Sequence, residues 1–297
     1  MKNIFKGMGV ALLTPFRPAL TPSGCEVDYE KIEELVEYII SNGADFICLL
    51  GSTAETACLS AEEKKQIKDV VCKSANKRVP LLIGMGDNNT SRLIEEINSF
   101  DFTGIDGILS VCPFYNKPRQ EGIYQHYKAI ASSTNLPIVM YNVPSRTGTN
   151  IAAETTIKLA KEVPNIVAIK EASGNIEQIR TIIEAEIPDF DVISGDDGLT
   201  YDMICMGAVG VISVIGNALP KKFSDMVHGA LKNNYKEAIP IHHQLTDAYN
   251  LLGVDGNPAG IKSMMSAMGM IENILRLPLV KATENTYTKF QDFLSTL

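Results

Sequence analysis

The chain has 297 residues, of which 45% are hydrophobic and 21% charged, the composition of an ordinary globular protein. Its 35 acidic and 27 basic side chains give a formal charge of −8, which argues against nucleic acid as a partner because phosphates require a basic surface. No apolar run is long enough to span a membrane, and the first residues lack the apolar stretch and cleavage site of a signal peptide. We therefore expect a cytoplasmic protein.

Eight short apolar runs alternate with longer amphipathic stretches through most of the chain. Runs of this length are too short for helices, and their nearly continuous apolar character is typical of parallel strands covered on both faces. They lie at 9–13, 46–50, 80–83, 105–111, 137–140, 166–169, 191–193 and 209–212.

Helix signals fall between and after these runs. Asp28 precedes apolar residues spaced along one helical face. Ser60 and Glu63 form a capping box ahead of a lysine-rich amphipathic stretch. After about residue 220 the strands stop, and four further helices are expected, at 221–230, 235–252, 259–270 and 284–294.

Eight strand–helix units in succession predict a (β/α)8 TIM barrel, formed by residues 1–232, with a C-terminal helical domain at 233–297. A doubly wound open sheet is the alternative, and it normally carries a glycine fingerprint after an early strand. Gly84-Met85-Gly86 does not continue as G-x-G-x-x-G, so dinucleotide binding has no support in the sequence.

The sequence also lacks metal-binding patterns. The six cysteines form no close pair, and Cys48 and Cys112 lie in or beside apolar runs, as reduced cysteines do. Two of the four histidines are adjacent, and adjacent side chains on a helix point apart. We expect no metal ion and no cofactor.

Lys170 directly follows the sixth apolar run, at the carboxyl end of a strand, where parallel barrels carry their reactive residues. Burial in the barrel wall disfavours the charged ammonium and frees the amine to attack a ketone as a Schiff-base nucleophile. The alternative is a strand-end lysine that reaches water or pairs with a neighbouring acid such as Glu171. Position alone leaves both interpretations open.

Hydroxyl groups follow the neighbouring runs. Tyr141 is expected one strand earlier at the same rim, where a phenol could pass protons during imine formation, with Ser52, Thr53 and Tyr115 as relay partners. For the two tyrosines the alternative is a structural role, packing at the rim of the barrel with one hydrogen bond. For Ser52 and Thr53 the alternative is turn or cap chemistry, because Ser52 and Glu55 also fit a capping box.

Arg146 lies five residues beyond Tyr141, in the loop after Pro144. A planar guanidinium can bind a substrate carboxylate through two parallel hydrogen bonds. The alternative is an arginine on the solvated surface.

Three blocks in order give the chain a family resemblance: Y-N-K-P-R-Q-E-G-I-Y from Tyr115, Y-N-V-P-S-R-T-G from Tyr141 and K-E-A-S-G-N from Lys170. With these motifs the chain resembles the pyruvate-dependent class I aldolase-lyase family from about Gly7 to Lys262. Within that family it resembles the members that condense pyruvate with L-aspartate 4-semialdehyde in lysine and diaminopimelate biosynthesis. Relatives acting on sugar acids, such as N-acetylneuraminate lyase, are the alternative, but they generally lack the arginine at the position of Arg146.

The resemblance implies roles for the site residues. Lys170 would form the imine with pyruvate, and Tyr141 would relay protons with Ser52 and Tyr115, the latter reaching across from a neighbouring subunit. Thr53 would hold the pyruvate carboxylate and Arg146 that of the second substrate. Gly195 and Ile212 would shape the pocket through their backbones. The crossing tyrosine implies a homodimer, and the family commonly forms a dimer of dimers. A catalytically silent barrel that binds a keto acid as a sensor would lack Lys170, Tyr141 or Tyr115, and all three are present.

Two departures from the family pattern carry expectations. Ala54 stands where the family usually has glycine, and if that position needs a positive φ, alanine would be strained by about 1 kcal/mol.

Lysine-sensitive members bind lysine through a glutamate and a histidine, and this chain has Arg92 and Ala61 there, although Asn88 and Thr56 remain compatible. A cation facing an ammonium ligand is repulsive. We therefore expect that lysine does not inhibit this protein.

Overall fold

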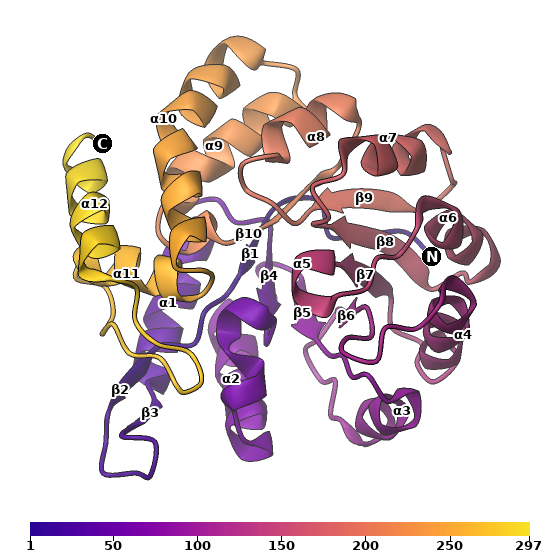
Figure 1. Ribbon diagram of the computed structural model, residues 1–297, viewed down its shortest axis with the longest axis horizontal. Coiled ribbons are helices and arrows are strands. Elements are labelled where there is room, and N and C mark those ends of the chain that lie inside the picture. The colour runs from indigo at the N-terminus through magenta and orange to yellow at the C-terminus, as the bar shows by residue number, and fades with distance from the viewer.

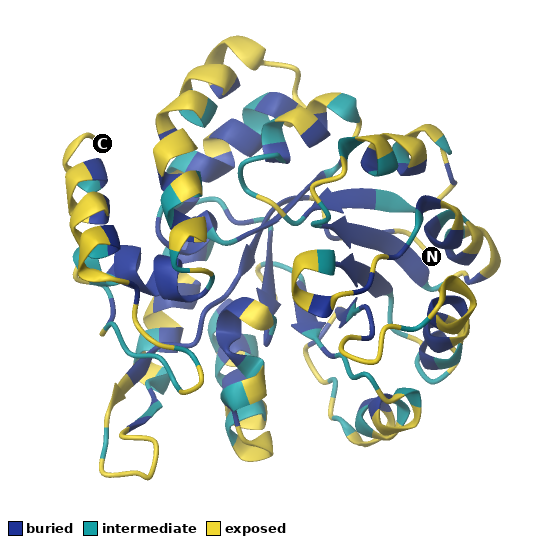
Figure 2. Ribbon diagram, in the orientation of Figure 1, coloured by how far each residue is buried: buried dark blue, intermediate teal, exposed yellow.

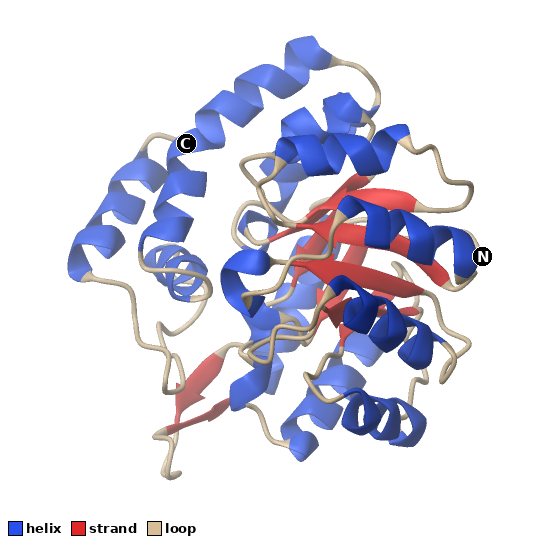
Figure 3. Cartoon of the chain, turned by 45° about the vertical axis from the view of Figure 1, so that its right-hand side comes forward, coloured by secondary structure: helices blue, strands red, loops and turns tan.

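The computed structural model describes residues 1–297 and shows a closed barrel of eight parallel strands. Around the barrel the strands follow the order β1-β10-β9-β8-β7-β6-β5-β4, and every neighbouring pair is parallel. Helices surround the strands on all sides (Figure 3). The predicted (β/α)8 fold is confirmed. The barrel strands are β1 (Gly7–Ala11), β4 (Phe46–Leu49), β5 (Leu81–Gly84), β6 (Gly107–Val111), β7 (Ile138–Asn142), β8 (Ile166–Glu171), β9 (Asp191–Ser194) and β10 (Gly210–Ser213).

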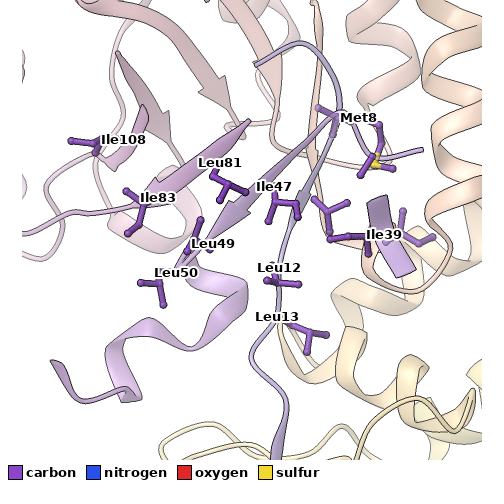
Figure 4. Packing of buried hydrophobic residues seen from close by; sticks show 14 of the residues in the cluster. Met8, Leu12, Leu13, Ile39, Ile47, Leu49, Leu50, Leu81, Ile83 and Ile108 are labelled. Atoms are coloured by element: carbon purple, nitrogen blue, oxygen red, sulfur yellow. The ribbon is translucent and has the colours of Figure 1, made fainter. Parts of the chain in front are cut away.

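Each strand is buried on both faces, which explains its nearly continuous apolar sequence. On β4, Phe46 and Cys48 belong to the cluster inside the barrel, whereas Ile47 and Leu49 belong to the layer between strands and helices, as alternating side chains require. Figure 4 shows this outer layer continuing along neighbouring strands and onto Ile39 of α1. The barrel strands are mostly dark blue in Figure 2, while the helices expose their outer faces.

The helices connect successive strands, and the two predicted N-caps are confirmed. The Asp28 side chain accepts a hydrogen bond from the backbone N–H of Lys31. Ser60 and Glu63 form the reciprocal capping box at the start of α2. The barrel helices are α1 (Tyr29–Ser41), α2 (Ala61–Ala75), α3 (Thr90–Ser99), α4 (Gln120–Ala131), α5 (Pro144–Thr147), α6 (Ala153–Glu162), α7 (Ile176–Glu184), α8 (Thr200–Met206) and α9 (Pro220–Leu231).

Three more helices follow the barrel, and they lie together on one side of it (Figure 1). These are α10 (Tyr235–Val254), α11 (Ala259–Ala267) and α12 (Glu284–Ser295), and α10 packs along α9. The C-terminal helices are confirmed; a division into domains at residue 232 stays a prediction, and this residue lies between α9 and α10.

Two features differ from the sequence interpretation. An antiparallel hairpin, β2 (Phe16–Pro18) and β3 (Cys25–Val27), lies between β1 and α1 and was not predicted, since three-residue strands carry too little periodicity to detect. The helix expected at 259–270 ends at Ala267, and Gly269 nearby has a φ of 72°, a backbone conformation that favours glycine at helix ends. None of the helices combines the length and apolar character that crossing a bilayer requires.

Candidate active site

Lys170 and Tyr141 lie side by side at the carboxyl ends of neighbouring strands. They are direct partners in the register of β7 and β8, and both belong to the strands themselves rather than to the following loops. The Lys170 side chain is 5% exposed, and its Nζ lies 4.4 Å from the centroid of the Tyr141 ring. The strand pairing therefore brings together the amine and the phenol that the sequence singled out.

No acid neutralises Lys170. Glu171, its neighbour in sequence, is fully buried and accepts hydrogen bonds from Asn142 and from the backbone N–H of Ser173. Successive side chains of a strand point to opposite faces, so Glu171 stabilises the outer side of the barrel rim. Cys48 lies close enough to Lys170 to sense its charge, but burial raises the pKa of that thiol to about 11 and keeps it neutral. The interpretation of Lys170 as a partner of Glu171 is wrong.

Ser52 and Thr53 lie in a 3-10 helix, Ser52–Ala54, that follows β4. Thr53 is 2% exposed and its Oγ1 accepts a hydrogen bond from Nδ2 of Asn257 over 2.9 Å. Ser52 does not cap a helix with Glu55, because Glu55 instead forms a fully buried ion pair with Lys262 of α11. Ser52 and Thr53 both line the cavity at the barrel mouth.

Ala54 is not strained. The residue with a positive φ in this loop is Glu55, at 54°, whereas Ala54 belongs to the 3-10 helix, and its carbonyl accepts a hydrogen bond from Thr14. The conditional expectation of strain at Ala54 is therefore not met. The left-handed conformation falls one residue later, where the ion pair with Lys262 holds the side chain.

Arg146 lies on the short helix α5, and its side chain lines the same cavity. It is solvent-exposed, and one Nη2 hydrogen bond, 3.1 Å long, reaches the backbone carbonyl of Asn257. No carboxylate of the chain pairs with it, so the other guanidinium N–H groups remain available to a ligand. Arg146 is therefore both exposed to solvent and part of the cavity lining.

Gly195 and Ile212 occupy different places. Gly195 lines the cavity just beyond β9, where a Cβ would lie 3.0 Å from Cε of Lys170. Ile212 is 1% exposed, and its side chain packs in the apolar cluster inside the barrel; it is not part of the cavity lining. The structure thus brings Gly195, but not Ile212, into the pocket.

Tyr115 does not line the pocket of its own chain. Its side chain is 87% exposed, its φ is 72°, and its backbone N–H donates to the carbonyl of Thr147. The backbone of Tyr115 is thereby tied to the end of α5, and its side chain is left exposed to solvent.

The cavity at the barrel mouth has a volume of about 220 Å³ and includes residues that sequence reasoning missed. The C-terminal helical region closes one side of it. The signal in the sequence was the N-P dipeptide at Asn257, shortly after the end of α10, because such dipeptides mark turns. The missed residues from this region are Tyr249, Leu252, Gly253 and Asn257.

Asp196 and Asp197 also line the cavity, but their oxygens are engaged by the backbone. Asp196 accepts hydrogen bonds from the N–H groups of Gly198 and Leu199. Asp197 accepts from Val214 and Ile215, and burial raises its pKa to about 6. These carboxylates hold the loop after β9 in place, and neither pairs with Lys170 or Arg146.

A (β/α)8 barrel with an unpaired, buried lysine beside a tyrosine at its mouth belongs to the class of scaffolds suited to Schiff-base chemistry. The sequence model of the Dihydrodipicolinate synthetase family matches residues 4–297. The chain belongs to this family.

Relatives and solved structures agree with this assignment. The chain is 53% identical to the 4-hydroxy-tetrahydrodipicolinate synthase of Phocaeicola vulgatus over 98% of this chain and 97% of the relative. The crystal structure of dihydrodipicolinate synthase from Thermotoga maritima superimposes with a TM-score of 0.94 at 37% identity, covering 99% of each chain. The chloride-inhibited dihydrodipicolinate synthase from Acinetobacter baumannii complexed with pyruvate has a TM-score of 0.92 at 37% identity, covering 98% of each chain.

Proposed function

We propose that this protein condenses pyruvate with L-aspartate 4-semialdehyde to give 4-hydroxy-tetrahydrodipicolinate, in lysine and diaminopimelate biosynthesis in the cytoplasm. The observation that carries the proposal is the position of Lys170, buried, free of any acid and beside Tyr141. The identity of the relatives supports it, since those at about 50% identity are named for this reaction.

The keto acid is bound covalently. The Lys170 amine attacks the ketone carbon of pyruvate, and loss of water from the carbinolamine gives an imine. Tyr141, with Ser52, passes the protons that the addition and dehydration require. The Thr53 hydroxyl donates a hydrogen bond to the pyruvate carboxylate, and Gly195 shapes the pocket beside the imine, while Ile212 stays buried in the barrel interior below the cavity.

The second substrate enters beside the enamine. Loss of a proton from the methyl carbon of the imine gives an enamine, whose carbon attacks the aldehyde of L-aspartate 4-semialdehyde and forms the new C–C bond. Arg146 binds the carboxylate of this substrate through its free N–H groups. The substrate amine then displaces Lys170 by transimination, which closes the ring and frees the enzyme.

The proton relay includes Tyr115 of a neighbouring subunit. The 87% exposure of Tyr115, together with its backbone anchored at Thr147, supports a side chain that reaches another molecule. The protein would then be at least a homodimer, and the expected full assembly is a dimer of dimers. Analytical ultracentrifugation measures the number of subunits.

Borohydride reduction in the presence of pyruvate, followed by peptide mass mapping, tests the covalent step. We expect the reduced adduct on Lys170, and we expect both the adduct and turnover to be abolished in Lys170→Arg. Label on another lysine, or turnover that survives this substitution, would overturn the proposal.

A coupled assay tests the identity of the second substrate. Pyruvate consumption should depend on L-aspartate 4-semialdehyde, and Arg146→Ala should raise the KM for that substrate more than the KM for pyruvate. Retro-aldol cleavage of sugar acids with no response to the semialdehyde would instead assign the chain to the sugar-acid aldolases.

A further inference from the structure

Asn257 contacts two of the proposed substrate-binding residues through different groups. Its side-chain Nδ2 donates to Thr53 Oγ1 over 2.9 Å, and its backbone carbonyl accepts from Arg146 Nη2 over 3.1 Å. Asn257 follows α10, outside the barrel. One residue of the C-terminal region therefore touches both groups that are expected to bind carboxylates.

In the hydrogen bond between Asn257 and Thr53, the threonine hydroxyl is the acceptor. A threonine hydroxyl has one hydrogen to donate and two lone pairs that accept. Because Oγ1 accepts from Asn257, and the hydroxyl has no acceptor within the chain, its hydrogen remains for a ligand in the cavity that Thr53 lines. Thr53 is 2% exposed, so its rotamer is set by these neighbours rather than by bulk water.

The segment that carries Asn257 is joined to the Thr53 loop at a second point. Five residues later, Lys262 of α11 forms the fully buried ion pair with Glu55, two residues after Thr53. The backbone N–H of Arg276 donates to the other oxygen of Glu55 over 3.0 Å. The segment from Asn257 to Lys262 and the loop from Thr53 to Glu55 are thus joined at two points.

We propose that Asn257 is a positioning residue that orients the Thr53 hydroxyl as a donor to the carboxylate of the bound keto acid. This inference rests on the proposed function, in which Thr53 binds that carboxylate. The C-terminal helical region then contributes to keto acid binding as well as to packing. The contact acts before imine formation, so its loss changes the pyruvate concentration required and not the final extent of reaction.

Borohydride trapping measured against pyruvate concentration tests this role. In Asn257→Ala the half-saturating pyruvate concentration should rise about five- to tenfold, the effect of one neutral hydrogen bond. The fraction of Lys170 labelled at saturating pyruvate should equal that of the wild type. Asn250→Ala, on an exposed position of α10, is the matched control and should match the wild type throughout.

A double-mutant cycle identifies Thr53 as the route of the effect. Thr53→Val removes the hydroxyl, and adding Asn257→Ala to it should raise the half-saturating concentration by less than twofold, because the interaction is already lost. Multiplicative effects, or the same half-saturation in Asn257→Ala and the wild type, would overturn the role of Asn257. Absence of any label on the wild type would overturn the proposed function and this role with it.

Discussion

Gly195 lies directly against the side chain of Lys170. A Cβ at this position would come within 3.0 Å of Lys170 Cε and 2.7 Å of the Cβ of Ala172, closer than real side chains pack. Glycine is needed here for space and not for backbone conformation, since Gly195 has no positive φ. The loop after β9 thereby determines where the reactive amine lies.

Gly195→Ala should lower the rate of imine formation by about tenfold to a hundredfold. The added methyl displaces Lys170 from its position beside Tyr141, and displacements near 1 Å can reduce rates on this scale. Borohydride trapping at a series of reaction times, at a fixed pyruvate concentration, measures the rate of imine formation. Gly198→Ala, three residues along the same loop, is the control because its Cβ would meet no atom closer than 3.4 Å. Equal rates in the two variants would show that the amine tolerates the methyl group.

Lys262→Met should destabilise the protein by about 3–5 kcal/mol, because it leaves the buried carboxylate of Glu55 without its partner. Both members of the pair are fully buried, and Glu55 already adopts a left-handed backbone. Urea unfolding measures the change. Lys221→Met breaks an exposed pair with Asp225 and should change the free energy of unfolding by less than about 1 kcal/mol. If the two variants lost similar amounts of unfolding free energy, burial would not be what makes the pair between Lys262 and Glu55 important.

L-Lysine at sub-millimolar concentration should leave the reaction rate unchanged. Arg92 occupies the position expected of an acidic ligand, and its guanidinium is paired with Asp87 of the preceding loop. Ala61, the first residue of α2, offers no polar side chain. Initial rates with and without lysine, compared with a lysine-sensitive member of the family in the same assay, check this. Inhibition in both proteins would show that another group accepts the ammonium.

The barrel was predictable because each strand is covered on both faces and therefore leaves a compact apolar run in the sequence. The same logic placed Lys170 and Tyr141 at one rim, and the register of β7 and β8 brings them together. Lys170, Tyr141, Ser52, Thr53, Arg146 and Gly195 were named from the sequence, and all line one cavity.

Contacts between distant segments could not be predicted. Asn257 and Thr53 are 204 residues apart, and Glu55 and Lys262 are 207 apart. Local patterns report which face of an element is apolar, but not which loop will receive a polar side chain from another element. The same limit produced the wrong interpretations of Glu55 as a cap residue and of Glu171 as a partner of Lys170.

The stability of the protein should fall as the pH is lowered from about 6.5 to 4 because of His126. This side chain is 4% exposed on α4, its Nδ1 lies 2.9 Å from Thr90 Oγ1, and its Nε2 is buried without a partner. Burial lowers the pKa of His126 to about 4, whereas an unfolded histidine titrates near 6.5. Between these values the unfolded chain binds a proton that the native protein does not, so unfolding is favoured as the pH falls.

Comparison with His126→Gln isolates this effect from the carboxylates that also titrate in acid. A difference of about 2.5 pKa units corresponds to about 3 kcal/mol, so the free energy of unfolding of the wild type should fall by about this much more than that of the variant between pH 7 and pH 4. Urea unfolding at a series of pH values gives both curves. Parallel curves would mean that the native protein protonates His126 as readily as the unfolded chain does, and that the buried Nε2 finds an acceptor once it carries a hydrogen.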